Sequence, residues 1–256
     1  MVVLLESRGI DIVVQERMLV RALDLTVQEG TITALLGRNG AGKTLTMHTL
    51  AGLRASARGE IQLAQRPLAQ WPRKALARQL GLLTQTSEDP FPATVMELVL
   101  MGRSPHLGFW DLEDEADRQI ARQALAQAEI EHLETRDITT LSGGERRRVA
   151  LALLLTQDPR VLLLDEPLNH LDPHHQLHIL EVLQERAARG RGVVMSLHDA
   201  GMAARFAQQA VLLFGDGDWL SGPANEVLTA ETIGRLYGVK VRELQWEGGR
   251  TFVAEG

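Results

Sequence analysis

The 256-residue chain contains no cysteine, and this absence removes several kinds of chemistry. A protein without cysteine has no disulfide framework, no thiol nucleophile and no cysteine-ligated metal site. A reducing cytoplasm fits this composition, although the absence of cysteine does not by itself prove that location.

Long hydrophobic runs are also missing. The longest candidates, such as Val149–Leu155, have the length of buried strands or helix faces and fall well short of the roughly 18 residues that cross a bilayer. The opening residues Met1–Glu6 lack a basic start and a small-residue cleavage site, so we expect no signal peptide. If this protein moves a solute through a membrane, another chain must form the path.

An excess of positive charge is absent as well. The formal net charge is −6, which argues against a surface built mainly to hold nucleic acid. A hydrophobic content of 45% with 23% charged residues is ordinary for a globular protein. At this length the chain can bury a sizeable core, as one large domain or two small ones.

What the chain does contain is a glycine-rich segment of a specific kind, with the pattern G-x-x-x-x-G-K-[ST]. Its residues are Gly37, Arg38, Asn39, Gly40, Ala41, Gly42, Lys43 and Thr44. The apolar run Thr31–Leu36 before it predicts a strand, and the spacing of apolar residues in Lys43–Leu53 predicts a helix. A glycine loop between a strand and a helix is the setting of a phosphate-binding loop, whereas the alternative is a glycine turn before an ordinary helix.

The residue types of this segment suit a nucleotide triphosphate. Gly37, Gly40 and Gly42 let backbone N–H groups turn inward around phosphate oxygens. Lys43 supplies a positive charge for the β- and γ-phosphates, and the Thr44 hydroxyl is placed to ligate Mg²⁺.

An acidic pair follows a second buried strand. The run Val161–Leu164 is apolar throughout, as expected for a strand buried on both faces of a parallel sheet. Asp165 at its end can hold the Mg²⁺ shell beside Thr44, and Glu166 can orient and polarise an attacking water. The alternative is an acidic pair that caps the following turn.

Three further segments indicate a function only in combination with the glycine-rich segment and the acidic pair. Gln85 follows the run Gly81–Thr84, and His198 follows the predicted strand Gly192–Leu197. Alone, each could be an ordinary surface or packed side chain. Ser142, Gly143 and Gly144 could form an N-cap before a helix from about Glu145 to Leu155, or an anion site at that helix start, and both can hold at once.

Together these motifs, in this order, resemble the ATPase subunit of an ATP-binding cassette (ABC) transporter, from about Asp11 to the last residues. The resemblance implies an α/β fold: a P-loop NTPase (RecA-like) core with a mostly parallel sheet, an antiparallel β edge and an inserted helical subdomain. We expect the ATP-binding domain to span residues 1–240, with the helical subdomain at about 90–155. Residues 241–256 then form a short C-terminal extension packed on the core.

The resemblance also assigns roles. It implies that Gln85 touches Mg²⁺ and the nucleophilic water, and that His198 senses the γ-phosphate. It implies that the Ser142–Gly144 segment caps the γ-phosphate held by a second copy of the chain, with Asp172 reaching across the same interface. ATP and Mg²⁺ are then the cofactors, in a homodimer with two head-to-tail sites.

In two places the chain departs from the family pattern. No Tyr, Phe or Trp lies between Met1 and Gly37, where the family commonly stacks an aromatic ring on adenine; Val13 or Val14 occupies that place. Leu45 stands where the family usually has a second hydroxyl residue. Neither change touches hydrolysis chemistry, so we expect weaker ATP binding but an active ATPase.

Softer signals resemble the importers of ferric siderophores, haem and cobalamin. They are Phe91–Val95, Met101–Gly108, Asn169–Pro173 with His175 and Gln176, and Leu236–Val239. This resemblance implies permease subunits that bind the helical subdomain, and a periplasmic or extracellular substrate-binding protein that acts indirectly. It places the chain peripherally, on the cytoplasmic face of the bacterial cell membrane.

Several alternatives stay open. An exporter ATPase would share every catalytic residue, and a non-transport cassette protein would act on ribosomes or DNA. A simple P-loop kinase would leave Ser142 and His198 without purpose.

Two further clusters are given no function. His170, His174 and His178 are spaced by four, which could suit a metal site, but we expect a solvent-facing cluster. The acidic stretch Asp111–Asp117 is most simply a solvated helix start.

Overall fold

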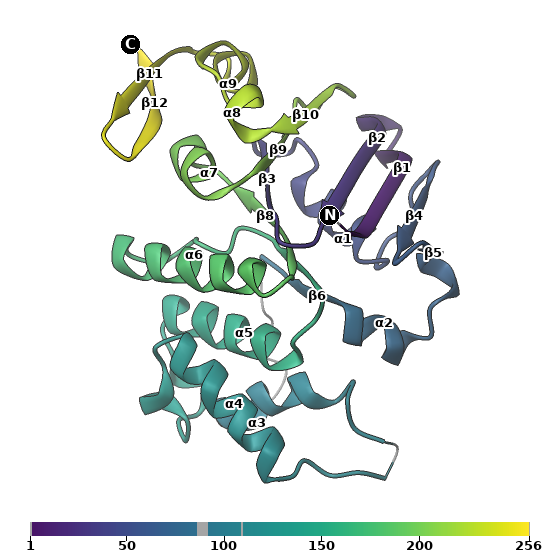
Figure 1. The fold of residues 1–256 in the computed structure, drawn as a ribbon, viewed down its shortest axis with the longest axis vertical. Coiled ribbons are helices and arrows are strands. Elements are labelled where there is room, and N and C mark those ends of the chain that lie inside the picture. The colour runs from purple at the N-terminus through teal and green to yellow at the C-terminus, as the bar shows by residue number, and fades with distance from the viewer. Residues whose placement is uncertain (1, 86–91, 109, 256) are drawn as a thin grey trace.

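The computed structural model describes residues 2–85, 92–108 and 110–255, and its centre is a six-stranded sheet (Figure 1). The strands run in the order β10 (Trp219–Pro223), β9 (Gln209–Leu213), β3 (Ile32–Gly37), β8 (Gly192–Leu197), β7 (Val161–Leu164) and β6 (Leu80–Leu83). All neighbours pair in parallel except β10, which is antiparallel to β9. The expected mostly parallel sheet is therefore confirmed.

Two antiparallel sheets flank this centre. One has the order β2 (Arg17–Gln28), β1 (Val3–Val14), β4 (Glu60–Leu63) and β5 (Arg66–Pro67), which confirms the expected antiparallel edge. The other is a hairpin of β11 (Lys240–Trp246) and β12 (Gly249–Glu255) near the C-terminus. This hairpin contacts α7 (Ala200–Phe206) and α9 (Ala230–Tyr237).

Helices cover the central sheet and extend beyond it. The remaining α-helices are α1 (Lys43–Leu50), α2 (Arg73–Gln79), α3 (Val95–Leu100), α4 (Glu115–Gln127), α5 (Gly143–Gln157), α6 (Pro173–Ala188) and α8 (Ala224–Val227). Short 3₁₀ turns are η1 (Leu68–Gln70), η2 (Met101–Arg103), η3 (Glu131–Leu133) and η4 (Ile138–Thr140). No helix in the described ranges is long and apolar enough to span a membrane.

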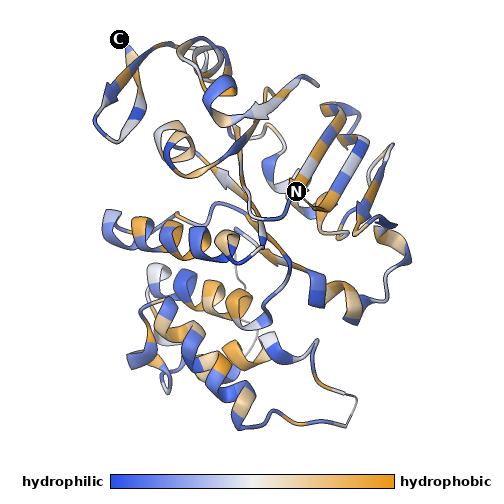
Figure 2. Ribbon diagram, viewed as in Figure 1, coloured by the Kyte–Doolittle hydropathy of each residue, from blue (hydrophilic) through white to orange (hydrophobic). Residues whose placement is uncertain are grey.

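Strand β3 separates two hydrophobic cores. Ile32, Ala34 and Leu36 face the core shared with α3–α6, while Leu35 faces the core shared with the antiparallel sheet and α1. Because successive side chains of a strand point to opposite faces, a strand buried on both sides is apolar at most positions. Figure 2 shows the same apolar character where α3, α4 and α5 pack together.

The carboxyl ends of four adjacent parallel strands place the predicted motifs together. The register pairs Leu36 with Leu197 and Leu83 with Leu164. The residues that follow β3, β8, β7 and β6 therefore leave the sheet at one edge, which is where ligands bind in open α/β sheets.

The region between Gln85 and Ser142 contains α3 and α4, with an isolated bridge between Thr94 and Asp137. Helix α4 buries Asp117, Ala121, Ala124 and Leu125, whereas Ala116 is exposed. The buried face of this helix therefore begins at Asp117, one residue after Ala116. Phe91, part of a segment used to assign the family branch, lies outside the described residues.

Helix α1 is shorter than predicted. It ends at Leu50, with Ala51 as its C-cap, and Gly52 follows with φ +72°. A glycine in the left-handed region ends a helix readily. Leu53 then lies beyond the helix and is 69% exposed, so its expected place on the apolar face was wrong.

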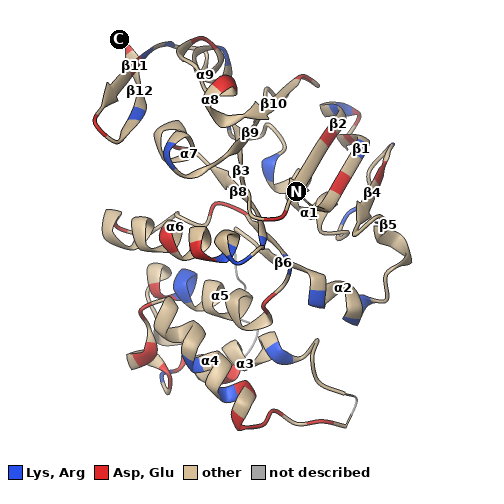
Figure 3. Ribbon diagram, in the orientation of Figure 1, with Lys and Arg blue, Asp and Glu red and all other residues tan. Residues whose placement is uncertain are grey.

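Figure 3 shows the acidic residues at the start of α4. One of them, Asp117, is buried, so this helix start is only partly solvated. Asp114 and Asp117 form a capping box, and the Asp117 carboxylate accepts a 2.8 Å bond from Arg103 Nε. Arg103 also donates to the Thr156 carbonyl on α5 at 3.2 Å. The hydrogen bond from Arg103 lowers the pKa of Asp117. Through Arg103, the Asp117 carboxylate also connects η2, α4 and α5.

We predict that Asp117→Asn lowers the free energy of unfolding by about 2 kcal/mol near pH 7, because a charged hydrogen bond at a nearly buried site is lost. A carboxyl whose pKa is lowered in the fold contributes stability above its unfolded pKa of about 3.9. That contribution disappears as the pH falls through the folded pKa, so the gap between wild type and variant should narrow on acidification. Urea denaturation from pH 7 to pH 3 measures both effects.

Glu115→Gln is the matched control, since Glu115 begins the same helix with a side chain that is 77% exposed. Its pair with Arg122 should contribute at most about 1 kcal/mol. Equal stability of Asp117→Asn and wild type at pH 7, or a gap that widens in acid, would contradict this role for Asp117.

Candidate active site

A cleft of about 940 Å³ opens where these strands end. The residues that line it include Arg38, Asn39, Gly40, Gly42, Lys43, Thr44, Gln85, Glu166, Asn169 and His198. Segments far apart in the sequence thus meet around one space, as the motif order predicted.

The glycine loop has a backbone that most residues cannot adopt. Gly40 has φ +79° and Gly42 has φ +103°, and Gly42 is the N-cap of α1. Gly37 is restricted differently, because a Cβ there would lie 2.9 Å from the Leu213 carbonyl oxygen. The free N–H groups at the start of α1 and its positive end make this loop an anion-binding site.

Lys43 is buried at the bottom of the cleft. Its ammonium donates a 2.9 Å hydrogen bond to the Gly37 carbonyl and lies 3.8 Å from Glu166 Oε1. Burial lowers the pKa of Lys43, while the nearby carboxylates Glu166 and Asp165 oppose that shift. The ammonium therefore has few contacts that compensate its burial. An anionic ligand would supply such contacts.

The Glu166 side chain is only 7% exposed. Its carboxylate contacts residues that follow three different strands. Oε1 lies 2.7 Å from His198 Nε2, and Oε2 accepts a 2.8 Å bond from Gln85 Nε2. Asn169 Nδ2 also donates to Oε2. Gln85, Glu166 and His198, which are separated widely in sequence, are therefore in direct contact.

The backbone at Glu166 is in an unusual conformation. Its φ is +50°, in the left-handed region that costs a non-glycine residue roughly 1–2 kcal/mol. The Ser196 hydroxyl accepts a 2.8 Å bond from the Glu166 amide and helps to hold this turn. A strained residue at the end of a buried strand is a frequent feature of functional sites.

Asp165 is fully buried, with one carboxylate oxygen free. Oδ1 accepts a 2.6 Å bond from the Ser196 hydroxyl. Among the residues that the structure describes, Oδ2 has no hydrogen-bond partner. A buried carboxylate oxygen without a donor is costly unless a cation binds it, so the donor set of Asp165 with Thr44 fits a hard divalent ion such as Mg²⁺.

The wall beside the glycine loop carries the two departures from the family pattern. Val14 and Leu45 both line the cleft, together with Gln15 and Arg17. Of the two candidate positions, Val13 and Val14, the one among the lining residues is Val14. Because it is aliphatic, this position cannot supply an aromatic face for a base.

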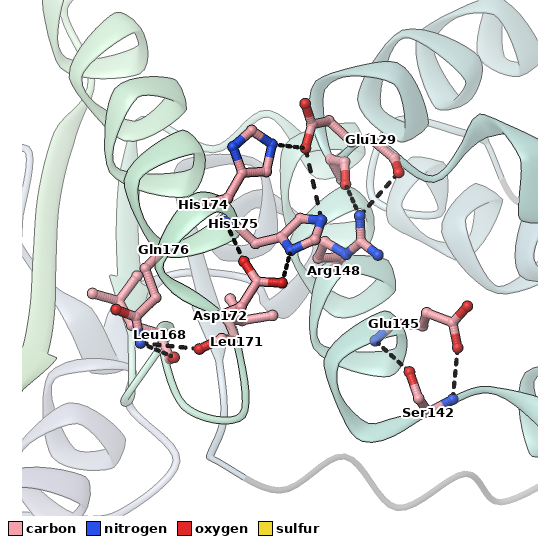
Figure 4. Close-up of polar contacts among 11 residues, drawn as sticks. Glu129, Ser142, Glu145, Arg148, Leu168, Leu171, Asp172, His174, His175 and Gln176 are labelled. Atoms are coloured by element: carbon pink, nitrogen blue, oxygen red, sulfur yellow. Dashed lines mark hydrogen bonds and ion pairs between the residues drawn. The ribbon is translucent and has the colours of Figure 1, made fainter.

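The Ser142 segment forms a helix cap away from the cleft (Figure 4). Glu145 N–H donates to Ser142 Oγ at 3.3 Å, and Ser142 N–H donates to the Glu145 carboxylate at 2.7 Å. A Cβ on Gly143 would meet nothing within 4 Å, whereas one on Gly144 would lie 3.1 Å from the His170 carbonyl oxygen. The predicted N-cap is confirmed, and the structure does not bring this segment to the lining of its own chain's cleft.

Asp172 also lies outside the cleft lining, as the N-cap of α6 (Figure 4). Its carboxylate accepts bonds from the His175 amide at 3.0 Å and lies 2.8 Å from His175 Nδ1. The amide group of Gln176 donates to the carbonyls of Leu168 and Leu171, each at 3.2 Å. The first turn of α6 therefore fixes the loop that precedes it.

The histidine cluster is solvent-facing only in part. His170 and His174 are exposed, but His178 is half-buried and lies 2.8 Å from the Gln127 carbonyl. Within the described residues, no group of three or more His, Asp or Glu side chains could hold a metal ion. The expected solvent-facing cluster is therefore confirmed at His170 and His174, while His178 is half-buried.

Four residues at this site were not among the site residues predicted from the sequence. Asn169 and Ser196 bond Glu166 and Asp165, and the Tyr237 hydroxyl donates to the His198 carbonyl at 2.9 Å. Arg147 donates to main-chain carbonyls behind the site. Asn169 follows Glu166 by three residues and could have been found by that spacing; the others depend on tertiary contacts.

Known proteins share both the sequence and the shape of this chain. A hemin import ATP-binding protein (HmuV) of Gloeobacter violaceus is 41% identical, over 93% of this chain and 88% of its own length. The ferric enterobactin transport ATP-binding protein (FepC) of Escherichia coli is 35% identical, over 85% of this chain and 81% of its own.

Two solved structures extend the comparison. A chain of a metal-chelate type ABC transporter in an inward-facing conformation has a TM-score of 0.86 at 26% identity, over 100% of this chain and 98% of its own. A dimeric ATP-binding cassette bound to ADP and phosphate has a TM-score of 0.75 at 23% identity, over 86% of this chain and 98% of its own. At 23% identity, the similarity to the second structure shows the fold alone.

A family model described as ABC transporter matches residues 20–169, which is more than half of the sequence and includes the glycine loop, Gln85, Ser142 and Glu166. The chain belongs to the ABC transporter family, as an ATP-binding subunit.

Proposed function

We propose that this chain hydrolyses ATP to power import of a metal chelate through a separate membrane permease. The observation that carries the proposal is the Glu166 carboxylate, buried at the phosphate loop in contact with Gln85 and His198. Hydrolysis needs an acidic group next to the terminal phosphate and a buried cation beside it. Glu166 and Lys43 provide both within one cleft.

The phosphate groups of ATP bind to the loop from Gly37 to Thr44. Backbone N–H groups and the start of α1 hold their oxygens, including those near Arg38, Asn39 and Ala41. Lys43 exchanges its bond to the Gly37 carbonyl for the β- and γ-phosphates. The charged phosphate oxygens compensate the cost of burying the ammonium.

Thr44, Gln85 and Asp165 would hold Mg²⁺, which supplies positive charge to the phosphate oxygens when it is bound. The free Oδ2 of Asp165, among the described residues, supports this assignment. Ser196 keeps Asp165 in place through its other oxygen.

Glu166 orients the attacking water and accepts a proton from it as the water oxygen bonds to the γ-phosphorus. The bond from the γ-phosphorus to the β–γ bridging oxygen breaks, and ADP leaves with that oxygen. Gln85 and His198 hold its two carboxylate oxygens, and His198 also reaches the γ-phosphate. No covalent intermediate forms, so the rate depends on positioning and on charge stabilisation.

A second copy of the chain completes each site in this proposal. Ser142, Gly143, Gly144 and Asp172 belong to the proposed nucleotide contacts but are not among the residues that line their own chain's cleft. An isologous dimer brings the helix start of one copy to the nucleotide of the other. Two ATP molecules are then held between two chains.

The solute and the remaining partners follow from the relatives. Those compared above are named for hemin and ferric enterobactin, which supports haem or a ferric siderophore as the solute; cobalamin depends on the sequence resemblance alone. The chain sits peripherally on the cytoplasmic face of the bacterial membrane, bound to permease subunits. A substrate-binding protein delivers the solute from the other side.

Glu166→Gln should reduce ATP hydrolysis by about two to three orders of magnitude, because an amide cannot polarise the water as a carboxylate does. Nucleotide binding should remain, so the variant should accumulate as an ATP-bound dimer. Phosphate release and size-exclusion chromatography with ATP measure the two effects. Glu185→Gln, a change at a 63% exposed glutamate, is the control, and normal hydrolysis by Glu166→Gln would show that the assignment is wrong.

Val14→Tyr should lower the dissociation constant for ATP about tenfold, because stacking of an aromatic ring on a base contributes roughly 1–3 kcal/mol. Equilibrium titration with a fluorescent ATP analogue measures it. Val14→Leu controls for added bulk without a π-face. An unchanged dissociation constant for ATP in Val14→Tyr would show that the adenine binds away from Val14.

The transport function is tested by purifying the tagged Glu166→Gln chain with ATP from detergent-solubilised native membranes. Recovery of a membrane protein with many spanning segments, in equimolar amount, is the expected result. Recovery with ribosomes or DNA, or only as a dimer free of membrane protein, would replace transport by a non-transport cassette function.

A further inference from the structure

Arg147, on α5, is a buried cation that the proposed chemistry does not use. Its side chain is only 8% exposed, and burial lowers its pKa to about 10. A buried guanidinium needs hydrogen-bond partners. Nε of Arg147 has none among the described residues, so the two terminal nitrogens make these contacts. The partners of Arg147 therefore show what the residue is for.

These partners are main-chain carbonyls at two catalytic strand ends. Nη1 donates to the carbonyl of Thr84 and lies 3.4 Å from that of Gln85. Nη2 donates to the carbonyl of Asp165. One side chain thus connects the residue after β6 with the residue after β7.

The two other arginines of the run Arg146–Arg148 bind elsewhere. Arg146 donates to the carbonyls of Leu141 and Thr139, just before its own helix. Arg148 donates to the carbonyl of Glu129, at the end of α4 (Figure 4). Contact with the catalytic strand ends therefore comes from the position of Arg147, not from the basic run as such.

Arg147 contacts the main chain of the two residues that adjoin Glu166, one through its side chain and one through the peptide bond. The Gln85 carbonyl belongs to the residue whose side chain donates to Glu166, and the Asp165 carbonyl belongs to the peptide that leads into Glu166. With φ +50°, Glu166 has a backbone that needs support from its surroundings. A shift of Arg147 would therefore move both Gln85 and the Glu166 peptide.

We propose that Arg147 is a positioning residue for hydrolysis, which holds the Gln85 and Asp165 main chain in the arrangement that Glu166 requires and connects it to the helix that Ser142 caps. This inference depends on the proposed function. In the proposed dimer, α5 presents Ser142 to the partner's nucleotide. Arg147 thus links a chain's own catalytic carboxylate to the segment that completes the other site.

The test compares Arg147→Met with wild type in the full chain, by steady-state hydrolysis and by titration with a fluorescent ATP analogue. The expected result is a fall in kcat of at least tenfold, with the nucleotide dissociation constant within twofold of wild type. Arg147→Lys, which keeps the charge and one donor group, should recover part of kcat. A residue that only stabilises the fold would not give this separation of kcat from binding.

Arg186→Met is the matched control, because Arg186 has a side chain that is 14% exposed and binds Asp158 and Gln127 away from the cleft. It should lower the melting temperature without lowering kcat. If Arg147→Met does not fold, Arg147→Lys and Arg147→Gln carry the comparison, with a lower kcat expected for Gln, which lacks the charge.

A double-mutant cycle with Gln85→Ala separates this inference from the proposed function. If Arg147 acts through Gln85 and Glu166, its effect on kcat should shrink at least threefold in the Gln85→Ala background. Wild-type kcat in the folded Arg147 variants, or equal effects in both backgrounds, would overturn the inference. Normal hydrolysis by Glu166→Gln would instead overturn the proposed function.

Discussion

The buried Glu166 carboxylate, 3.8 Å from the Lys43 ammonium, is the constraint on which the rest of the site depends. Two opposite charges that are each less than 10% exposed need further hydrogen bonds to be tolerated. Gln85, Asn169 and His198 provide them for the carboxylate, while the Gly37 carbonyl provides one for the ammonium. Each of these groups comes from a different strand end or loop, so the charge pair organises the whole sheet edge.

The sheet makes this arrangement possible. Parallel strands all finish at the same edge, and their apolar residues are buried on both faces, so polar chemistry is left to the residues that follow each strand. Asp165 and Glu166 follow β7, His198 follows β8 and the glycine loop follows β3. The helices around α5 contribute at a distance, because Arg147 donates to the main chain behind these residues. One buried side chain of α5 thus contacts the main chain after both β6 and β7.

Much of this was predictable from the sequence, for physical reasons. The strand Val161–Leu164 is continuous in its apolar character, and Ser142 with Glu145 forms the capping pattern that the structure contains. Contacts between side chains distant in sequence were not predictable, because nothing in the local pattern shows that Ser196 bonds Asp165 or that Asp117 meets Arg103. Asp117 belongs to the buried face of α4 because Arg103 pairs with its carboxylate.

The most direct test of this account is a crystal structure of the Glu166→Gln chain with Mg²⁺ and ATP. The account predicts two chains around a twofold axis, with Lys43 moved from the Gly37 carbonyl to the β- and γ-phosphates. Ser142 of one copy should lie against the γ-phosphate bound to the other. ATP held by a single chain, with Lys43 still on the Gly37 carbonyl and Ser142 facing solvent, would contradict it.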